Sequence, residues 1–234
     1  MPKATTESGA LVFRGPPRRL RLETELPEFR DAHFEPDAEL SAVLSRASPF
    51  HARTDGEGRL RGARARFDRS TPPGEYHARL VSADAELPVV VHVEAHPRLR
   101  ISPAVLVFSA AEGSKPRATV ILTNKGNVPL DIPAATTVSL CRDDGLDDAL
   151  TSALLTDSDE FEELFRHFVE RLRALHGGLL PLRFLSGSGL LAAGRSVAAV
   201  VEAEFSPRLA AGHGYHGGIV IHGSRLQVAV TVTA

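Results

Sequence analysis

The chain has few of the residues that carry common kinds of site chemistry. It has 234 residues and one cysteine, Cys141, so no intramolecular disulfide and no thiolate zinc cluster can form. A lone cysteine is most often a small buried residue. A basic excess is also missing, since 27 Lys and Arg face 29 Asp and Glu. Proteins that bind phosphate backbones usually carry such an excess, so the composition does not favour nucleic acid as a partner.

Long apolar runs are absent as well. No stretch approaches the ~18 apolar residues of a membrane helix, and the first eleven residues contain no run of signal-peptide length. These absences predict no membrane insertion and a cytoplasmic location. Lysine is scarce beside arginine, which, with abundant Ala and Gly, suggests a bacterial chain from a GC-rich genome. With 43% apolar and 24% charged residues, the composition is that of an ordinary globular protein.

The chain has instead many short alternating segments separated by turn residues. Residues 1–9 are polar and aperiodic, which predicts a flexible terminus. From residue 10 to 96, strands recur without a long helical period, and residues 55–58 (Asp-Gly-Glu-Gly) are a strong hairpin signal. This spacing favours an antiparallel β-sandwich. Arg64 and Arg66 share one face of the strand that follows this turn, and we expect a solvated face or a protein-docking edge there.

Pro97 interrupts this pattern, because proline cannot donate to a sheet. We expect a domain boundary at His96-Pro97 and a second β-sandwich over residues 97–234. Residues 118–123 alternate as a strand, and residues 226–232 form the last strand. We expect these two strands to be edges at which a partner strand can pair.

A helical insertion over about 146–178 interrupts the second sandwich. Asp157 and Glu160 have the spacing of a capping box, and Gly177-Gly178 is expected to end the helix. We also expect Glu162 to pair with Arg166. A shorter helix is expected before it, with its apolar residues on one side. The longer helix carries one apolar stripe, made of Phe161, Leu164, Phe165, Phe168, Leu172 and Leu175.

This apolar stripe has two possible roles. It can cover an open end or face of the second sandwich, as apolar helix faces commonly do. Alternatively, Phe161, Leu164, Phe165, Phe168 and Leu172 can dock a partner subunit, because large apolar residues left uncovered form an interaction patch.

The segments around Asn124 resemble a known family. Residues 100–108 (Arg-Ile-Ser-Pro-Ala-Val-Leu-Val-Phe), followed by residues 123–130 (Thr-Asn-Lys-Gly-Asn-Val-Pro-Leu), are similar to the opening of bacterial immunoglobulin-like domains of the PapD-like and Hydin-type superfamily. Residues 72–78 and 87–93 resemble the closing strands of such modules. The resemblance covers about half of the chain and implies two tandem immunoglobulin-like antiparallel β-sandwiches, the second with an inserted helical hairpin. It implies little about function.

No motif of catalysis meets its structural requirements. Residues 212–217 (Gly-His-Gly-Tyr-His-Gly) match a dinucleotide-binding spacing, but a β pattern follows where a helix is required. His213, His216 and His222 are weak metal candidates, because an extended strand would separate His216 from His222 by ~20 Å. Asp143, Asp144, Asp147 and Asp148 lack EF-hand spacing, and we expect them to stabilise a helix start.

The sequence therefore predicts a non-enzymatic protein: a protein–protein interaction or structural subunit of a bacterial multiprotein assembly, with other protein subunits as partners and no cofactor. Two alternatives stay open. One is a metal-binding protein or metal-assisted enzyme that uses the C-terminal histidines. The other is a chaperone that donates an edge strand to its client.

Overall fold

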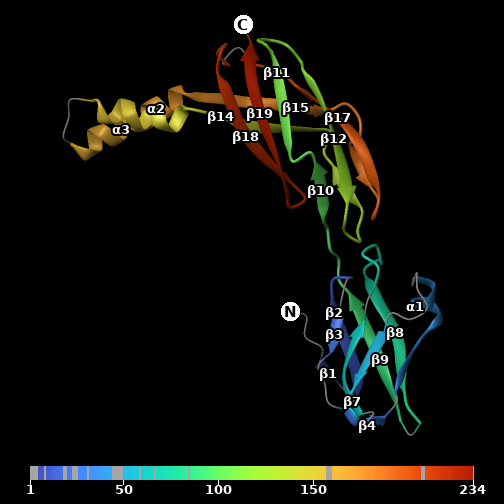
Figure 1. Cartoon of the computed structure of the whole chain (residues 1–234). Helices are drawn as coiled ribbons and strands as arrows, with labels where there is room; N and C mark the ends of the chain where they lie inside the picture. The colour runs from blue at the N-terminus through green and yellow to red at the C-terminus, as the bar shows by residue number, and fades with distance from the viewer. Residues whose placement is uncertain are drawn as a thin grey trace. The chain divides into compact units, whose positions relative to one another are not determined.

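The computed structural model describes residues 5–7, 9–17, 20–22, 26–30, 32–43, 50–57, 59–65, 67–83, 85–156, 160–206 and 209–233. The chain divides into two compact units, each an immunoglobulin-like β-sandwich (Figure 1). The first unit contains Met1–Arg98, Asn124–Pro129 and Ala192–Gly194, and the second contains Leu99–Thr123, Leu130–Leu191 and Arg195–Ala234.

Among the described residues of the first unit, the strands form two sheets. One follows the order β1-β2-β9-β8-β5, and in the other β7 pairs with β3, β4 and β6. In the five-stranded sheet, β2 runs parallel to the closing strand β9, and the remaining pairs are antiparallel. The bounds are β1 (Thr5–Glu7), β2 (Ala10–Gly15), β3 (Leu20–Leu22), β4 (Leu26–Arg30), β5 (His33–Pro36), α1 (Ala38–Val43), β6 (Phe50–Thr54), β7 (Arg59–Ala65), β8 (Gly74–Val81) and β9 (Glu86–Val93).

Alternation along these strands builds the first core. Leu11 and Phe13 of β2 point inward beside Val89 and Val91 of β9, and all four are at most 1% exposed. Thr5–Glu7 differ from the flexible terminus that the sequence predicts, since β1 pairs antiparallel with β2. Strand pairing uses backbone groups, so a polar segment without apolar periodicity can still join a sheet.

The second unit is built around one sheet of order β10-β12-β17-β15-β14-β18-β19-β11, with β13 and β16 as a separate pair. Because β15 pairs with both β14 and β17, it joins the two halves of this sheet. The bounds are β10 (Leu99–Ser102), β11 (Val105–Ala111), β12 (Arg117–Asn124), β13 (Leu130–Ile132), β14 (Ala135–Arg142), α2 (Gly145–Leu154), α3 (Phe161–Ala174), β15 (His176–Phe184), β16 (Gly189–Leu191), β17 (Ser196–Ala203), β18 (Gly214–Ile221) and β19 (Ser224–Thr233).

The two strands predicted to be edges are interior strands. Residues 118–123 lie in β12, between β10 and β17, and residues 226–232 lie in β19, between β18 and β11. The edge prediction is therefore wrong for both. Strands β10 and β11, which flank them, arise from the segment at the start of the unit, and β11 adds to β19 in parallel. Alternation within a strand shows which face is buried but not which strands lie beside it.

The helical hairpin is inserted between the paired strands β14 and β15. It consists of α2 and α3 and projects from the end of this strand pair (Figure 1). The helix α3 ends at Ala174, before the two glycines expected to end it, and Gly177 and Gly178 belong to β15. Gly178 has φ +81° beside an irregularity in the β14–β15 register. Gly177 allows the close packing of Tyr215, because a Cβ there would lie 2.7 Å from Tyr215 Cδ1. Gly178 accommodates the positive φ, and neither glycine lies at the end of α3.

Two local predictions concern α3. Asp157 lies outside the described residues, and Glu160 is the N-cap without a side-chain capping bond. Arg166 forms its ion pair with Glu163, at 3.2 Å, and not with Glu162. Spacings of three and four residues are both neighbours on a helix surface, so periodicity alone does not select between them.

Candidate functional site

The helical hairpin exposes an unusual number of large apolar side chains. No residue of α3 is buried. Six side chains form what we call the hairpin face, with these exposed fractions: Leu146 61%, Leu150 51%, Leu154 68%, Phe161 78%, Phe165 56% and Leu172 38%.

The spacing of these residues puts each set on one side of its helix. Leu146, Leu150 and Leu154 follow one another at intervals of four on α2. On α3, Phe161 and Phe165 stack with their ring centroids 6.1 Å apart, and Leu172 continues the same stripe seven residues after Phe165. Residues at these intervals share one face of a helix.

Both stripes lie on the same side of the hairpin. On α2 each exposed leucine directly follows a buried residue, Ala149 before Leu150 and Ala153 before Leu154. On α3 the exposed Phe165 likewise follows the half-buried Leu164. On each helix, the exposed stripe is thus rotated away from the α2–α3 contact in the same sense, when each helix is followed from its first residue to its last. Since the two helices run antiparallel, this common offset turns both stripes toward one face.

The residues predicted to dock a partner differ in their exposure. Phe161, Phe165 and Leu172 are exposed, whereas Leu164 and Phe168 are half-buried. Leu175 is buried at the C-cap of α3. The stripe therefore does not cover the sandwich in the way one hypothesis expected: α3 packs mainly on α2. The sequence alone could identify the α2 leucines from their spacing of four. That they form one six-residue apolar face with the α3 residues could be recognised only once the pairing of the two helices was known.

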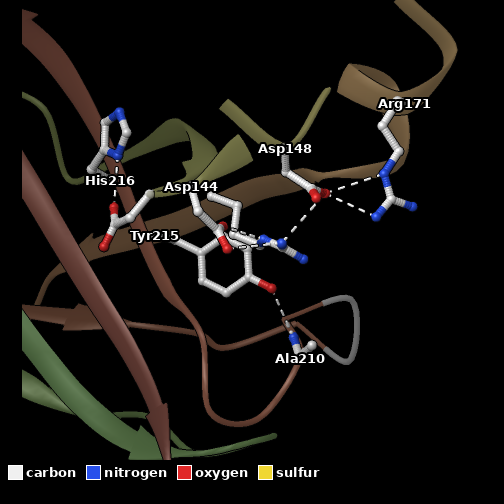
Figure 2. Close-up of polar contacts among 8 residues, drawn as sticks. Asp144, Asp148, Arg171, Ala210, Tyr215 and His216 are labelled. Carbon is white, nitrogen blue, oxygen red and sulfur yellow. Dashed lines mark hydrogen bonds and ion pairs between the residues drawn. The ribbon is translucent and has the colours of Figure 1, made fainter. Parts of the chain in front are cut away.

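Charged residues fix the base of the hairpin, where α2 begins at Gly145 and α3 ends at Ala174. Arg142, at the end of β14, donates from Nη2 to Asp144 Oδ2 at 2.9 Å, and its Nε also donates to Asp144. Asp148 of α2 accepts from Arg171 Nη2 at 2.8 Å and lies 3.6 Å from Arg142 Nη2. Figure 2 shows Asp148 between the two guanidinium groups. Asp148, itself in α2, thereby connects this helix to both β14 and α3.

The hydrogen bond between Arg142 and Asp144 also affects their protonation. It stabilises both charged forms, so it lowers the pKa of the Asp144 carboxyl from its usual 3.8 and raises the pKa of Arg142. The acidic cluster predicted to stabilise a helix start thus acts partly through ion pairs. Asp144 is the N-cap of α2, but its side chain makes no capping hydrogen bond.

A second contact lies beside this base. Asp143 Oδ1 is 2.7 Å from His216 Nδ1 of β18, and the Asp143 amide donates to the Gly214 carbonyl at 3.0 Å. The neighbouring Tyr215 is buried, and its hydroxyl accepts from the Ala210 amide at 3.0 Å (Figure 2). The two Asp143 contacts attach the start of the insertion to β18.

The three C-terminal histidines do not converge. His216 contacts Asp143, while His222, in the turn after β18 with φ 45°, has Nε2 2.7 Å from the Asp131 carbonyl. His213 precedes β18, and its carbonyl accepts from the Val232 amide. Among the residues that the structure describes, no group of three His, Cys, Asp or Glu side chains is placed to hold a metal ion.

The remaining predicted positions lie elsewhere. Arg64 is in β7 of the first unit, and Arg66 lies outside the described residues. Cys141 is exposed, not buried as expected, because Leu140 takes the inward position of β14. Within the described part of the chain, neither the hairpin helices nor α1 combine the length and apolar character needed to cross a membrane.

Comparisons with known proteins identify no family. No protein-family model matches the chain, and no curated protein matches it. Solved structures align at low similarity. A protein of unknown function from Porphyromonas gingivalis is 13% identical, with 98% of this chain and 99% of that chain covered and a TM-score of 0.29. Domains 4 and 5 of the S-layer protein SbsC are 18% identical (87% and 71% covered, TM-score 0.31).

An I-band fragment of titin is 9% identical, with 100% of this chain and 64% of that chain covered and a TM-score of 0.38. All these TM-scores are low, so the description of both units as immunoglobulin-like rests on their strand order and pairing.

Proposed function

We propose that this chain is a non-enzymatic subunit of a bacterial multiprotein assembly, and that the hairpin face is its binding surface for a protein partner. The observation that carries the proposal is the exposure of six large apolar side chains on one face of a charged, firmly attached hairpin.

The exposed apolar area supports this role. Taking about 200 Å² for a fully exposed large side chain, the hairpin face presents roughly 700 Å². The largest apolar patch of a typical monomer is about 300–600 Å². Exposure on this scale favours a surface that a partner covers.

The attachment of the hairpin supports the same role. Asp148 holds α2 to both Arg142 and Arg171, so the hairpin has a defined orientation relative to the strands of its own sandwich. A surface held in place loses less conformational freedom on binding than a mobile one. The polar contacts lie at the base and leave the apolar side chains free to meet a partner.

Affinity isolation from the source cells tests the proposal. The full chain, the Phe161→Ser/Phe165→Ser variant and the Leu190→Ser/Val220→Ser variant serve as baits. Leu190 and Val220 are 78% and 70% exposed, so the control removes comparable apolar surface outside the hairpin. We expect the wild type and control to retain the same partner in fixed stoichiometry, and the hairpin variant to lose it. Equal retention by all three baits would contradict the proposal.

A further inference from the structure

We propose that the partner of the hairpin face is a second copy of this chain. Two hairpins pack face to face and antiparallel, so that the end of α2 at Leu154 and the start of α3 at Phe161 lie over the base of the other hairpin. The product is a four-helix bundle. This inference rests on the proposed function and names the partner for the same surface.

The size of the hairpin face fits a dimer. Burying roughly 700 Å² on each copy gives about 1,400 Å² in total, within the range of about 1,200–2,000 Å² of specific stable interfaces. A two-fold interface joins the same patch on both copies, so the patch must be complementary to itself. The six side chains of the hairpin face are all Leu or Phe, and apolar surfaces of this kind need no matching donor or acceptor.

The sandwich at the base of each hairpin favours the tip-to-base geometry. A two-fold axis across the middle of the hairpins places α2 on α2 and α3 on α3 of the second copy, each pair running in opposite directions. All neighbouring helices are then antiparallel, as in up-and-down bundles with short loops. The sandwiches attached at the two bases lie at opposite ends of the bundle, so they do not compete for the same space.

Charges along α3 are complementary in this arrangement. Glu162 directly follows Phe161, and Arg173 directly follows Leu172, so both border the hairpin face on the same side of the helix. They lie near opposite ends of α3, and antiparallel pairing brings Glu162 of each copy beside Arg173 of the other. Neither residue has an ion-pair partner among the contacts found within the described chain. The dimer thus contains this bridge twice.

Sedimentation of the full chain tests the dimer. We expect the wild type to be a dimer at micromolar concentration, and Phe165→Glu to be a monomer, weakened at least about 100-fold because a charge would be buried at the centre of the interface. Val220→Glu is the matched control, since Val220 is 70% exposed on β18, and it should remain dimeric. Circular dichroism verifies that each variant is folded; Phe165 is 56% exposed, so no core contact is lost.

A charge exchange tests the antiparallel geometry. Glu162→Arg and Arg173→Glu should each weaken the dimer by roughly two- to tenfold, because each places like charges together at two sites. The double variant Glu162→Arg/Arg173→Glu should recover wild-type affinity. Failure of the double variant to recover would overturn the tip-to-base arrangement.

Two results would overturn the self-association itself. One is a wild-type chain that stays monomeric up to about 100 µM, and the other is a Phe165→Glu variant that remains dimeric. Neither decides the proposed function, which fails only if the hairpin variant keeps its partner in the affinity isolation. A monomeric wild type whose hairpin captures a different protein would refute the dimer and retain the binding surface.

Discussion

The strand pair β14–β15 and the hairpin inserted between its strands differ in the burial of their apolar side chains. Along β14, Val138 and Leu140 are fully buried, and along β15, Leu180 and Leu182 are at most 1% exposed. In the hairpin between these two strands, Leu150 and Phe165 are more than half exposed. Apolar content alone therefore does not identify a core residue, because burial depends on what the fold places opposite each face.

Truncation of one leucine in each region should show the largest difference. Leu140→Ala should lower the free energy of unfolding of the second unit by about 2–5 kcal/mol, since Leu140 is 0% exposed and its loss leaves a cavity. Leu150→Ala, at 51% exposure, should change it by less than about 0.5 kcal/mol in the monomer. Denaturant unfolding of both variants, monitored for the second unit, measures this contrast. Similar losses would show that the hairpin belongs to the core.

The close packing of β18 on β14 predicts the next largest effect. A Cβ at Gly217 would overlap the Ser139 carbonyl oxygen and lie 2.5 Å from Val138 Cγ1. Gly217→Ala should therefore cost about 1–3 kcal/mol of unfolding free energy. The adjacent Gly218 is the control, because its nearest contacts would be 3.4 Å away. Gly218→Ala should be much milder in the same unfolding experiment; equal costs would contradict the pairing of β14 with β18.

Removing the bridging carboxylate should affect the hairpin more than the sandwich. Asp148→Asn removes the negative charge that pairs with Arg142 and Arg171, and surface ion pairs contribute about 0.2–1 kcal/mol. Hydrogen exchange should become faster in α2 and α3 while protection in β14 and β18 is unchanged. Unaltered exchange in the helices would show that the bridge does not hold the hairpin.

Protonation of Asp144 at low pH should have the smallest effect of these changes on the base of the hairpin. The pKa of Asp144 is lowered in the folded state, so its contribution is present above its ordinary value of 3.8 and is lost as the pH falls through the lower folded pKa. Carboxyl chemical shifts should place the Asp144 titration below that of a free aspartate, and Arg142→Gln should return it to the ordinary range. A normal titration in the wild type would contradict the ion pair.

The sequence supported some features of the fold more strongly than others. Alternation and turn residues were sufficient to predict two β-sandwiches and a helical insertion. The same pattern failed for strand neighbours, since β12 and β19 are interior, and for the segment beginning at His176, where two glycines and Pro181 obscure the alternation. Strand order depends on pairing between distant segments, which local patterns do not encode.

The candidate site was only partly predictable for the same reason. Periodicity identified the apolar stripe of α3, including Phe161, Phe165 and Leu172. It did not distinguish a stripe that covers the sandwich from one that faces solvent, because this depends on the direction in which the hairpin leaves β14. It also could not predict that Asp148 lies between Arg142 and Arg171, residues separated by 29 positions in the chain.

By itself, the sequence determined the type of each main element, because side-chain period and turn residues act over a few neighbouring positions. Only the tertiary structure decided which strands are neighbours, which leucines are buried and which remain exposed. These properties depend on the atoms that distant segments bring to each face, and so they arise only when the chain has folded.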